Sequence, residues 1–229
     1  NGAGKSTTIR TLLGLIKPTS GRAFVCGMDI TQKKEEILAR VGYLPSEAVF
    51  YAGMRVRDVL KLSADLRKKD CTERAAMLCE RLQLDPARKV EELSFGNRKK
   101  VGIVCALQHA PELLILDEPT SGLDPLMQKA FFDILRECNE VGATVFLSSH
   151  ILSEIQRNCR RAAIIREGRI IACDSVEALS SNNARRVSVH GSVELDGLLG
   201  IRDKKEGPGT VSFLYSGEMG ALLQRLAAG

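Results

Sequence analysis

The residues that most directly indicate chemistry lie at the start of the chain, in the run Asn1–Thr8, which reads NGAGKSTT. Its Gly-Lys-Ser ending matches the second half of a phosphate-binding loop, whose full pattern is G-x-x-x-x-G-K-[ST]. Gly2 and Gly4 allow the backbone to curl, so that successive N–H groups point at phosphate oxygens. The ammonium of Lys5 suits the β- and γ-phosphates of a nucleotide, and the hydroxyl of Ser6 suits Mg²⁺. This run therefore predicts a phosphate site.

The helix that must position this loop follows directly. We expect it to open at Lys5 or Ser6 and to continue from Thr8 to Ile16, because Ile9–Leu15 is apolar at helical spacing. A helix start adds unpaired N–H groups and the positive end of a dipole. The first glycine of the full pattern and the strand before it would precede Asn1, so we expect the sequence to be a fragment. For this half motif alone, a glycine-rich loop with a chance Lys-Ser is the alternative.

A second candidate is the pair of carboxylates that ends the run Leu113–Pro119. Its continuous apolarity predicts a strand buried on both faces, as in a parallel sheet. The carboxyl ends of such strands are where open α/β sheets bind ligands. Asp117 could bind Mg²⁺ through water, and Glu118 could polarise an attacking water. The alternative is a strand capped by two solvated acids.

The remaining elements follow from hydrophobic periodicity. The predicted helices are Glu35–Arg40, Val56–Leu66, Glu73–Leu84, Arg98–Ala110, Met127–Glu140 and Ile151–Asn158. The predicted strands are Arg22–Met28, Val41–Pro45, a buried Thr144–His150, and a hairpin of Ala162–Arg166 with Arg169–Cys173. The helices between about 54 and 110 suggest a helical insertion in a β-rich domain. We read the run Arg98–Lys100 as a solvated helix face.

The texture of the chain changes after Leu179, where residues 180–183 read as a linker. We expect strands at Val187–His190 and Thr210–Tyr215, a polar loop at Lys204–Gly209, and a helix at Glu218–Ala228. Together these predict a small, βαβ-like appendage over 180–229, which follows a main domain over 1–179.

Composition narrows the function classes. The net charge is +5 and the pI about 8.9, which suits a protein near anionic lipid but is too weak to indicate nucleic acid. Seven cysteines without a C-x-x-C pair predict reduced thiols, mostly buried, rather than disulfides or a metal site. No apolar run approaches the roughly 20 residues of a membrane span.

Five motifs occur in order: Asn1–Thr8, Leu93–Asn97, Leu113–Pro119, Ser121–Asp124 and His150. Together they resemble the ATP-binding subunit of ABC transporters over about residues 1–179. The resemblance implies an α/β P-loop NTPase fold of the ABC type, with a mostly parallel core sheet, a helical subdomain at about 54–110, and here a small C-terminal α+β appendage.

The resemblance also implies roles for individual residues. Leu93–Asn97 is the signature loop, Ser121–Asp124 the D-loop and His150 the switch histidine. The implied catalytic residues are Glu118 and His150, and the implied Mg²⁺ ligands are Ser6 and Asp117. ATP would be held by Asn1, Gly2, Ala3, Gly4, Lys5, Ser6, Thr7, Ser94, Gly96, Asn97 and Asp124. His109 and His190 read as ordinary surface or core residues.

The signature loop can also be interpreted from its residues. Ser94 and Gly96 precede a predicted helix, so a hydroxyl, backbone N–H groups and a helix dipole converge on an anion. In the family that anion is the γ-phosphate of ATP on the other subunit. The alternative is that Ser94 is only a helix cap.

Two motifs depart from the family pattern. The signature usually resembles Leu-Ser-Gly-Gly-Gln, whereas here Phe95 replaces a Gly and Asn97 replaces the Gln. The loop after Val41–Pro45 usually carries a Gln that touches Mg²⁺ and senses the membrane subunit. Here it carries Ser46-Glu47, so the residue that makes this metal contact in the family is absent from the loop.

The resemblance implies an ATP-hydrolysing subunit that powers a membrane transporter, with an exporter as the preferred type. Its partners would be an integral membrane subunit and a second nucleotide-binding domain, joined head to tail by ATP at the cytoplasmic face of the membrane. No nucleic-acid partner is expected. The alternatives are a soluble ATPase of the same superfamily that acts on ribosomes or nucleic acid, and a module that holds ATP without hydrolysing it. The modest charge argues against the first, and Glu118 against the second.

Overall fold

The computed structural model describes residues 2–181, 185–191, 200–207, 209–215, 217 and 219–227. The chain divides into two compact units. The first comprises Asn1–Leu152 and Arg166–Arg169, and the second comprises Ser153–Ile165 and Ile170–Gly229. Asn1, which the sequence assigns to the phosphate loop, lies outside the described residues.

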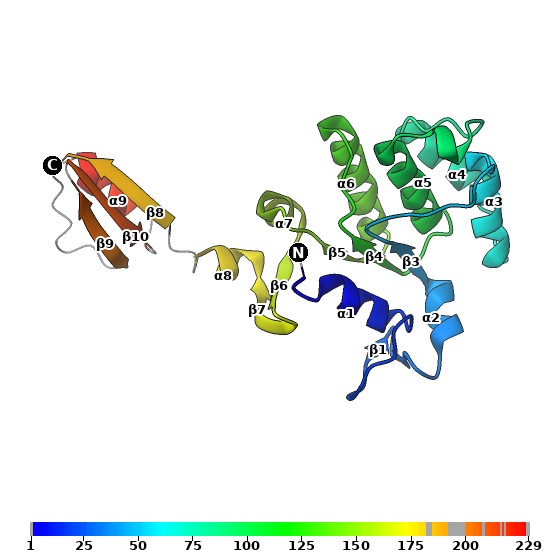
Figure 1. Ribbon diagram of the computed structural model, residues 1–229, viewed down its shortest axis with the longest axis horizontal. Helices are drawn as coiled ribbons and strands as arrows, with labels where there is room; N and C mark the ends of the chain where they lie inside the picture. The colour runs from blue at the N-terminus through cyan, green and yellow to red at the C-terminus, as the bar shows by residue number, and fades with distance from the viewer. Residues whose placement is uncertain are drawn as a thin grey trace. The chain divides into compact units, whose positions relative to one another are not determined.

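The first unit is built around the parallel sheet β3-β4-β5 (Figure 1). Its strands are β3 (Val41–Leu44), β4 (Leu113–Asp117) and β5 (Thr144–Ser148). The register aligns their carboxyl ends, pairing Leu44 with Leu116 and Asp117 with Ser148. The predicted parallel core sheet is therefore confirmed, and its polar ends meet at one edge.

The two faces of the sheet bury side chains in two separate clusters, because side chains alternate along a strand. On one face, Ile115 packs with Ile9 of α1 (Lys5–Leu12). On the other, Leu114 and Leu116 pack with the helices α5 (Phe95–Leu107) and α6 (Pro125–Glu140). Figure 1 shows α1 on one side of the sheet and α5 and α6 on the other.

Strand β5 is less buried than its sequence predicts. Thr144 and Phe146 are exposed, and Ser148 is its one buried residue. Among the described residues β5 pairs with β4 alone, so it lies at the edge of the sheet and one of its sides is left open.

The predicted helical region consists of α3 (Val56–Leu66), α4 (Thr72–Arg81), the short 3₁₀ helix η1 (Val90–Glu92) and α5. Its core includes Leu78, Leu82 and Val101, which are fully buried. His109, just beyond α5, is a core residue: its Nε2 lies 3.3 Å from the carbonyl oxygen of Val41. Burial, together with the nearby charge of Arg67, lowers the pKa of His109 to about 4.

Helix α5 packs against β3 at backbone distance. A Cβ added to Gly42 would lie 2.1 Å from the carbonyl oxygen of Ala106, and one added to Gly102 would lie 2.8 Å from a methyl group of Leu44. Because no other residue lacks a Cβ, both glycines are required for this contact. The contact fixes α5, the helix that begins at the signature loop, against β3, the strand that leads to Ser46.

The predicted strand Arg22–Met28 is instead two short antiparallel strands, β1 (Phe24–Val25) and β2 (Met28–Asp29). Cys26 and Gly27 between them have φ values of 51° and 76°. Positive φ at both central residues is the geometry of a tight hairpin turn, so the chain reverses where the sequence suggested continuation.

The remaining elements of this part agree with the predictions, within a few residues. They are α2 (Lys34–Arg40), α7 (Leu152–Asn158), β6 (Arg161–Arg166) and β7 (Arg169–Ser175). Helix α8 (Val176–Ser181) was not predicted: it contains Ser180 and Ser181, which the sequence assigned to a linker, and the rest of that linker, residues 182 and 183, lies outside the described residues. Strands β6 and β7 pair with each other around the predicted turn at Glu167-Gly168.

The C-terminal strands form a sheet of their own in the order β8-β10-β9, with β8 (Arg185–His190), β9 (Ile201–Gly207) and β10 (Thr210–Tyr215). With helix α9 (Met219–Ala227) this agrees with the predicted α+β appendage. The βαβ-like arrangement is wrong, because β8 and β9 both pair antiparallel with β10.

The predicted polar loop Lys204–Gly209 is also wrong, because most of it belongs to β9. Pairing with β10 satisfies the backbone of β9, and the charged side chains of residues 203–206 are exposed, with Lys204 and Glu206 paired at 2.8 Å. The apolar residues Phe213, Tyr215 and Leu222 form the buried core of this part. An edge strand tolerates such a polar sequence, since charge there discourages pairing with other chains.

Two further expectations can be checked on the described residues. Within them, no helix combines the length and the apolarity needed to cross a bilayer. The seven cysteines are free thiols, as predicted, but only Cys71, Cys79 and Cys138 are buried; Cys105 and Cys159 are partly buried, and Cys26 and Cys173 are exposed.

Candidate functional site

The phosphate loop leads directly into α1, as its glycines predict. Gly2 and Gly4 have φ values of 87° and 100°, which residues with a side chain rarely adopt. The carbonyl oxygen of Gly4 accepts hydrogen bonds from both the backbone N–H and the hydroxyl of Thr8. The carbonyl oxygen of Ala3 accepts one from Gly168 N at 2.9 Å.

The first turn of α1 carries Lys5, Ser6 and Thr7. Because the first four N–H groups of a helix have no partner inside it, this turn offers donors and a positive dipole end to an anion. The three residues that the sequence assigns to phosphate therefore lie on one helix terminus. The first-turn position of Lys5 also matters for the acidic residues described next.

Asp117 lies at the end of β4 and is almost completely buried. Its Oδ1 accepts a hydrogen bond from the hydroxyl of Ser148 at 2.5 Å, because the parallel register places these residues side by side. The same hydroxyl, and the carbonyl oxygen of Ser148, each lie 3.2 Å from the backbone N of Glu118. A solvated acid is thus excluded for Asp117.

The carboxylate of Glu118 lies between a lysine and a histidine. Its carboxylate lies 3.6 Å from Lys5 Nζ and 2.7 Å from His150 Nδ1. Its backbone has a φ of 48°, which turns the chain away from the strand direction at this residue. The side chain is 17% exposed, whereas that of His150 is 63% exposed. Three residues predicted separately from sequence are therefore in contact.

This arrangement can perform proton transfer next to a phosphate. A carboxylate with one histidine neighbour, beside a phosphate loop, is placed to orient water for attack on phosphorus. The groups suit Mg²⁺ as well. Asp117 offers a buried carboxylate and Ser6 a hydroxyl, which are hard oxygen ligands, and Mg²⁺ commonly takes one or two carboxylates and completes its shell with phosphate and water. Among the described residues there is no group of three or more His, Cys, Asp or Glu side chains that could hold a metal ion by itself.

The signature loop forms local contacts. Ser94 caps α5, with its Oγ accepting a hydrogen bond from Asn97 N at 3.3 Å. A Cβ added to Gly96 would lie 2.3 Å from the carbonyl oxygen of Gly122, so Gly96 packs directly on the D-loop. The capping alternative for Ser94 therefore holds in the isolated chain, and capping does not prevent its hydroxyl from donating to an anion.

The D-loop is ordered in a similar way. Asp124 caps α6 by accepting a hydrogen bond from Met127 N at 3.0 Å, and Pro125 occupies the first helical position. Gly122 has a φ of 79°, and a Cβ there would lie 2.4 Å from the ring of Phe95. The Phe that replaces the family Gly therefore packs on the D-loop.

The interpretation of Arg98–Lys100 as a solvated face is wrong. Lys99 and Lys100 are 2% and 8% exposed. Lys99 Nζ donates to the carbonyl oxygens of Pro45 at 3.1 Å, Ser46 at 2.9 Å and Asp117 at 3.4 Å. Burial lowers the pKa of Lys99 to about 8, and the charges of Asp117, Glu118 and Glu47 oppose that shift. Arg98 is exposed as predicted, whereas Lys99 and Lys100 are buried where the helix packs closely on the rest of the unit.

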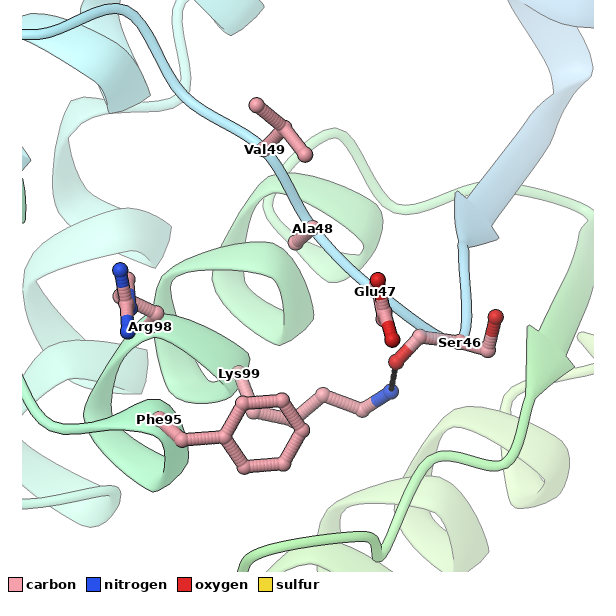
Figure 2. Close-up of a pocket in the computed structure, with 7 residues that line it drawn as sticks. All are labelled: Ser46, Glu47, Ala48, Val49, Phe95, Arg98 and Lys99. Atoms are coloured by element: carbon pink, nitrogen blue, oxygen red, sulfur yellow. Dashed lines mark hydrogen bonds between the residues drawn. The ribbon is translucent and has the colours of Figure 1, made fainter.

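A pocket of about 320 Å³ lies between the loop after β3 and the start of α5 (Figure 2). It is lined by Ser46, Glu47, Ala48, Val49, Phe95, Arg98 and Lys99. Val49 is 91% exposed and Phe95 is 49% exposed, so the pocket has apolar residues at its surface beside charged ones.

The sequence missed two residues of this region. Ser148 connects Asp117 to Glu118, and the signal was available, since a Ser at the end of a parallel strand pairs with the end of its neighbour. Lys99 connects α5 to the ends of β3 and β4. Its role gave no sequence signal, because a Lys in a charged run is normally exposed.

Comparisons with known proteins agree with this geometry. The family model described as ABC transporter matches residues 1–121. The chain is 40% identical over 192 residues to the bacitracin transport ATP-binding protein BcrA of Bacillus licheniformis, covering 81% of this chain and 61% of that protein. It is 36% identical over 190 residues to the ABC transporter ATP-binding protein YdbJ of Bacillus subtilis, covering 82% of this chain and 62% of that protein.

A solved structure of an ATP-binding subunit of an ABC transporter superposes with a TM-score of 0.74 at 32% identity. The match covers 78% of this chain and 77% of that one. The chain spans about three fifths of the length of the two curated relatives, and its described fold is that of the solved ATP-binding subunit.

Proposed function

Because the chain belongs to the ABC transporter family of ATP-binding domains, we propose that it binds MgATP and hydrolyses it to ADP and phosphate as the energy-coupling subunit of a membrane transporter. The observation that carries this proposal is the contact of Glu118 with both Lys5 and His150 behind the phosphate loop. A module that only stored ATP would not need a carboxylate between these groups.

Each residue has a role in the proposed reaction. The loop residues Gly2, Ala3 and Gly4, with Lys5, Ser6 and Thr7, hold the phosphates of ATP. Asp117 and Ser6 would hold Mg²⁺, which would neutralise phosphate charge when bound. Glu118 orients the attacking water and accepts its proton, and His150 contacts the γ-phosphate and keeps Glu118 in place through its Nδ1.

The second half of the site comes from another subunit. We propose that Ser94, Gly96 and Asn97 bind the γ-phosphate held by the facing chain, with Asp124 beside it. In this chain these residues are organised by α5, α6 and the Gly96–Gly122 contact rather than by the phosphate loop. ATP then stabilises a head-to-tail pair because it binds the closed pair more tightly than the open one.

The proposed partner is an integral membrane subunit at the cytoplasmic face of the membrane. The loop Ser46–Val49, with its exposed Val49, gives a partly apolar surface for it. Export is the preferred direction, on the resemblance of the signature and D-loop block to exporter subunits. A relative named for bacitracin transport is compatible with that choice.

Binding and chemistry can be separated by the variant Lys5→Ala in the full-length protein. It should weaken ATP binding by about a hundredfold, because a charge-assisted contact with phosphate is removed. Equilibrium binding of a fluorescent ATP analogue measures this, with Lys17→Ala as the control, since Lys17 is exposed and follows α1. Equal affinity in Lys5→Ala and the parent would contradict the assignment of the phosphate loop.

A further inference from the structure

Lys99 joins three elements that the proposed reaction uses. It lies in the second turn of α5, the helix that Ser94 caps. Its ammonium donates to Pro45 and Ser46, at the end of β3, and to Asp117, at the end of β4. Figure 2 shows its side chain extending from the helix to the backbone of Ser46.

Such a contact is specific, since a buried ammonium has few ways to be satisfied. Lys99 is 2% exposed, so its three donors must find partners inside the protein. All three partners are backbone carbonyls, which side-chain rotation cannot move. The ammonium therefore fixes the distance between the helix and the two strand ends.

The position of the contact is next to the reacting groups. The carbonyl of Asp117 belongs to the peptide unit that continues into Glu118, the residue beside Lys5 and His150. The carbonyls of Pro45 and Ser46 begin the loop where the family usually has a Gln but this chain has Ser46-Glu47. A shift of α5 would thus move both strand ends together.

We propose that Lys99 is a positioning residue for ATP hydrolysis. Its ammonium holds α5 against the loop after β3 and against the backbone that carries Glu118. This inference rests on the proposed function. The proposal invokes no change in the charge state of Lys99. The ammonium has three N–H donors, and three carbonyl oxygens accept them.

The test compares Lys99→Met and Lys99→Arg with Lys69→Met in the full-length protein. Met keeps the aliphatic stem of Lys99 without its donors, and Arg keeps the charge and the donors. Lys69 is the control lysine: its side chain is exposed, and its Nζ donates to the carbonyl of His109 at 3.1 Å rather than to the carboxyl ends of β3 and β4. The measurements are ATP affinity, kcat, thermal unfolding and hydrogen exchange of residues 46–48.

Lys99→Met should bind ATP within about threefold of the parent, while kcat falls by about tenfold to a hundredfold, as expected for a small displacement of a catalytic group. Hydrogen exchange at residues 46–48 should accelerate in Lys99→Met and not in Lys69→Met. Lys99→Arg should recover part of kcat. A fall in ATP affinity and kcat together with a lower unfolding midpoint, without recovery in Lys99→Arg, would indicate a merely structural role and overturn the proposal.

Unchanged kcat and unchanged hydrogen exchange in Lys99→Met would also overturn it. Hydrogen exchange separates this proposal from the proposed function, since it requires no turnover. If the parent fails to hydrolyse ATP but hydrogen exchange at residues 46–48 still accelerates in Lys99→Met, the ATPase function is wrong, whereas the positioning of this loop by Lys99 is supported. If the parent hydrolyses ATP and Lys99→Met does not change hydrogen exchange at residues 46–48, only the positioning role of Lys99 is wrong.

Discussion

The edge of the parallel sheet and the signature loop are organised in different ways. At the sheet edge, side chains contact side chains: Glu118 reaches Lys5 and His150, and Ser148 reaches Asp117. At the signature and D-loops, Ser94 and Asp124 cap their own helices, and backbone packs on backbone at Gly96 and Gly122. The sheet edge therefore fixes the positions of reactive side chains, whereas the signature and D-loops fix the backbone conformation of two packed loops.

This difference separates the expected effects of substitution. Removing the carboxylate of Glu118 or the hydroxyl of Ser148 at the sheet edge should change the chemistry while leaving the fold and ATP binding intact. Adding one atom at the signature loop should change how two loops fit, without removing any reactive group.

The largest effect is expected from Glu118→Gln. It removes the proton acceptor for the attacking water while keeping the size of the side chain, so hydrolysis should fall by about a hundredfold to a thousandfold. Phosphate release measures the rate. The variant should still bind ATP and accumulate as an ATP-dependent closed pair, visible by size-exclusion chromatography with and without ATP, or on the membrane partner.

The matched control is Glu112→Gln, at the other end of the same strand. Glu112 is exposed and pairs with Arg40, so the change should leave hydrolysis near the parent rate. If Glu118→Gln hydrolyses ATP at the parent rate, Glu118 is not the catalytic base, and the sheet edge does not hold the reactive groups as proposed.

The next largest effect is expected from Gly96→Ala. The added methyl would meet the carbonyl oxygen of Gly122 at 2.3 Å, so the signature loop and the D-loop must separate. Overpacking of this kind costs about 1 to 3 kcal/mol, and turnover should fall by roughly tenfold. Steady-state hydrolysis and thermal unfolding measure the two effects.

Gly220→Ala is the control for this change, because a Cβ there would have no heavy atom within 4 Å. Binding of ATP to the isolated chain should be unchanged in Gly96→Ala, since the phosphate loop is untouched. If Gly96→Ala loses ATP affinity as strongly as Lys5→Ala, the two regions are not separate in the way described above.

Much of the sheet edge could be predicted from sequence. Leu113–Leu116 is continuously apolar, Asp117 follows, and the parallel arrangement places its end beside Ser148. The contact of Glu118 with Lys5 and His150 then follows from three motifs meeting at one edge. Local pattern and tertiary structure agree there, which is why the prediction of the parallel sheet succeeded.

The errors have tertiary causes. Lys99 looks solvated in a run of three basic residues, yet Gly42 and Gly102 bring α5 so close to β3 that the lysine is buried. Cys26 adopts positive φ, which no periodicity reveals, so one predicted strand became a hairpin. The charged β9 is a strand because β10 supplies its hydrogen bonds, a fact absent from its own sequence.

A smaller effect is expected from Ser148→Ala. The variant removes the hydroxyl that donates to Asp117 and receives the N–H of Glu118, while the backbone carbonyl of Ser148 still pairs with Glu118. Losing one hydrogen bond to a buried carboxylate costs about 1.5 to 3 kcal/mol, part of which should appear in kcat as a decrease of about fivefold to tenfold. Ser149→Ala, the adjacent serine, is the control. Equal kcat in Ser148→Ala and the parent would mean that Asp117 does not rely on this hydroxyl.

The smallest effect is expected from Ser46→Gln, which tests whether the loop after β3 belongs with the sheet edge or with the surface that faces the membrane partner. A Gln side chain is longer than Ser by two carbons and offers an amide oxygen, which Mg²⁺ accepts as a ligand. If the loop reaches the metal, the Mg²⁺ concentration for half-maximal hydrolysis should fall by about twofold to threefold, since a neutral oxygen adds little to a shell already holding phosphate and carboxylate. The measurement is a Mg²⁺ titration of ATP hydrolysis at fixed ATP. Glu47→Gln, made in parallel, separates this effect from the loss of a nearby negative charge. An unchanged titration in Ser46→Gln places the loop with the surface for the membrane partner, and Lys99 then connects the two regions through backbone carbonyls alone.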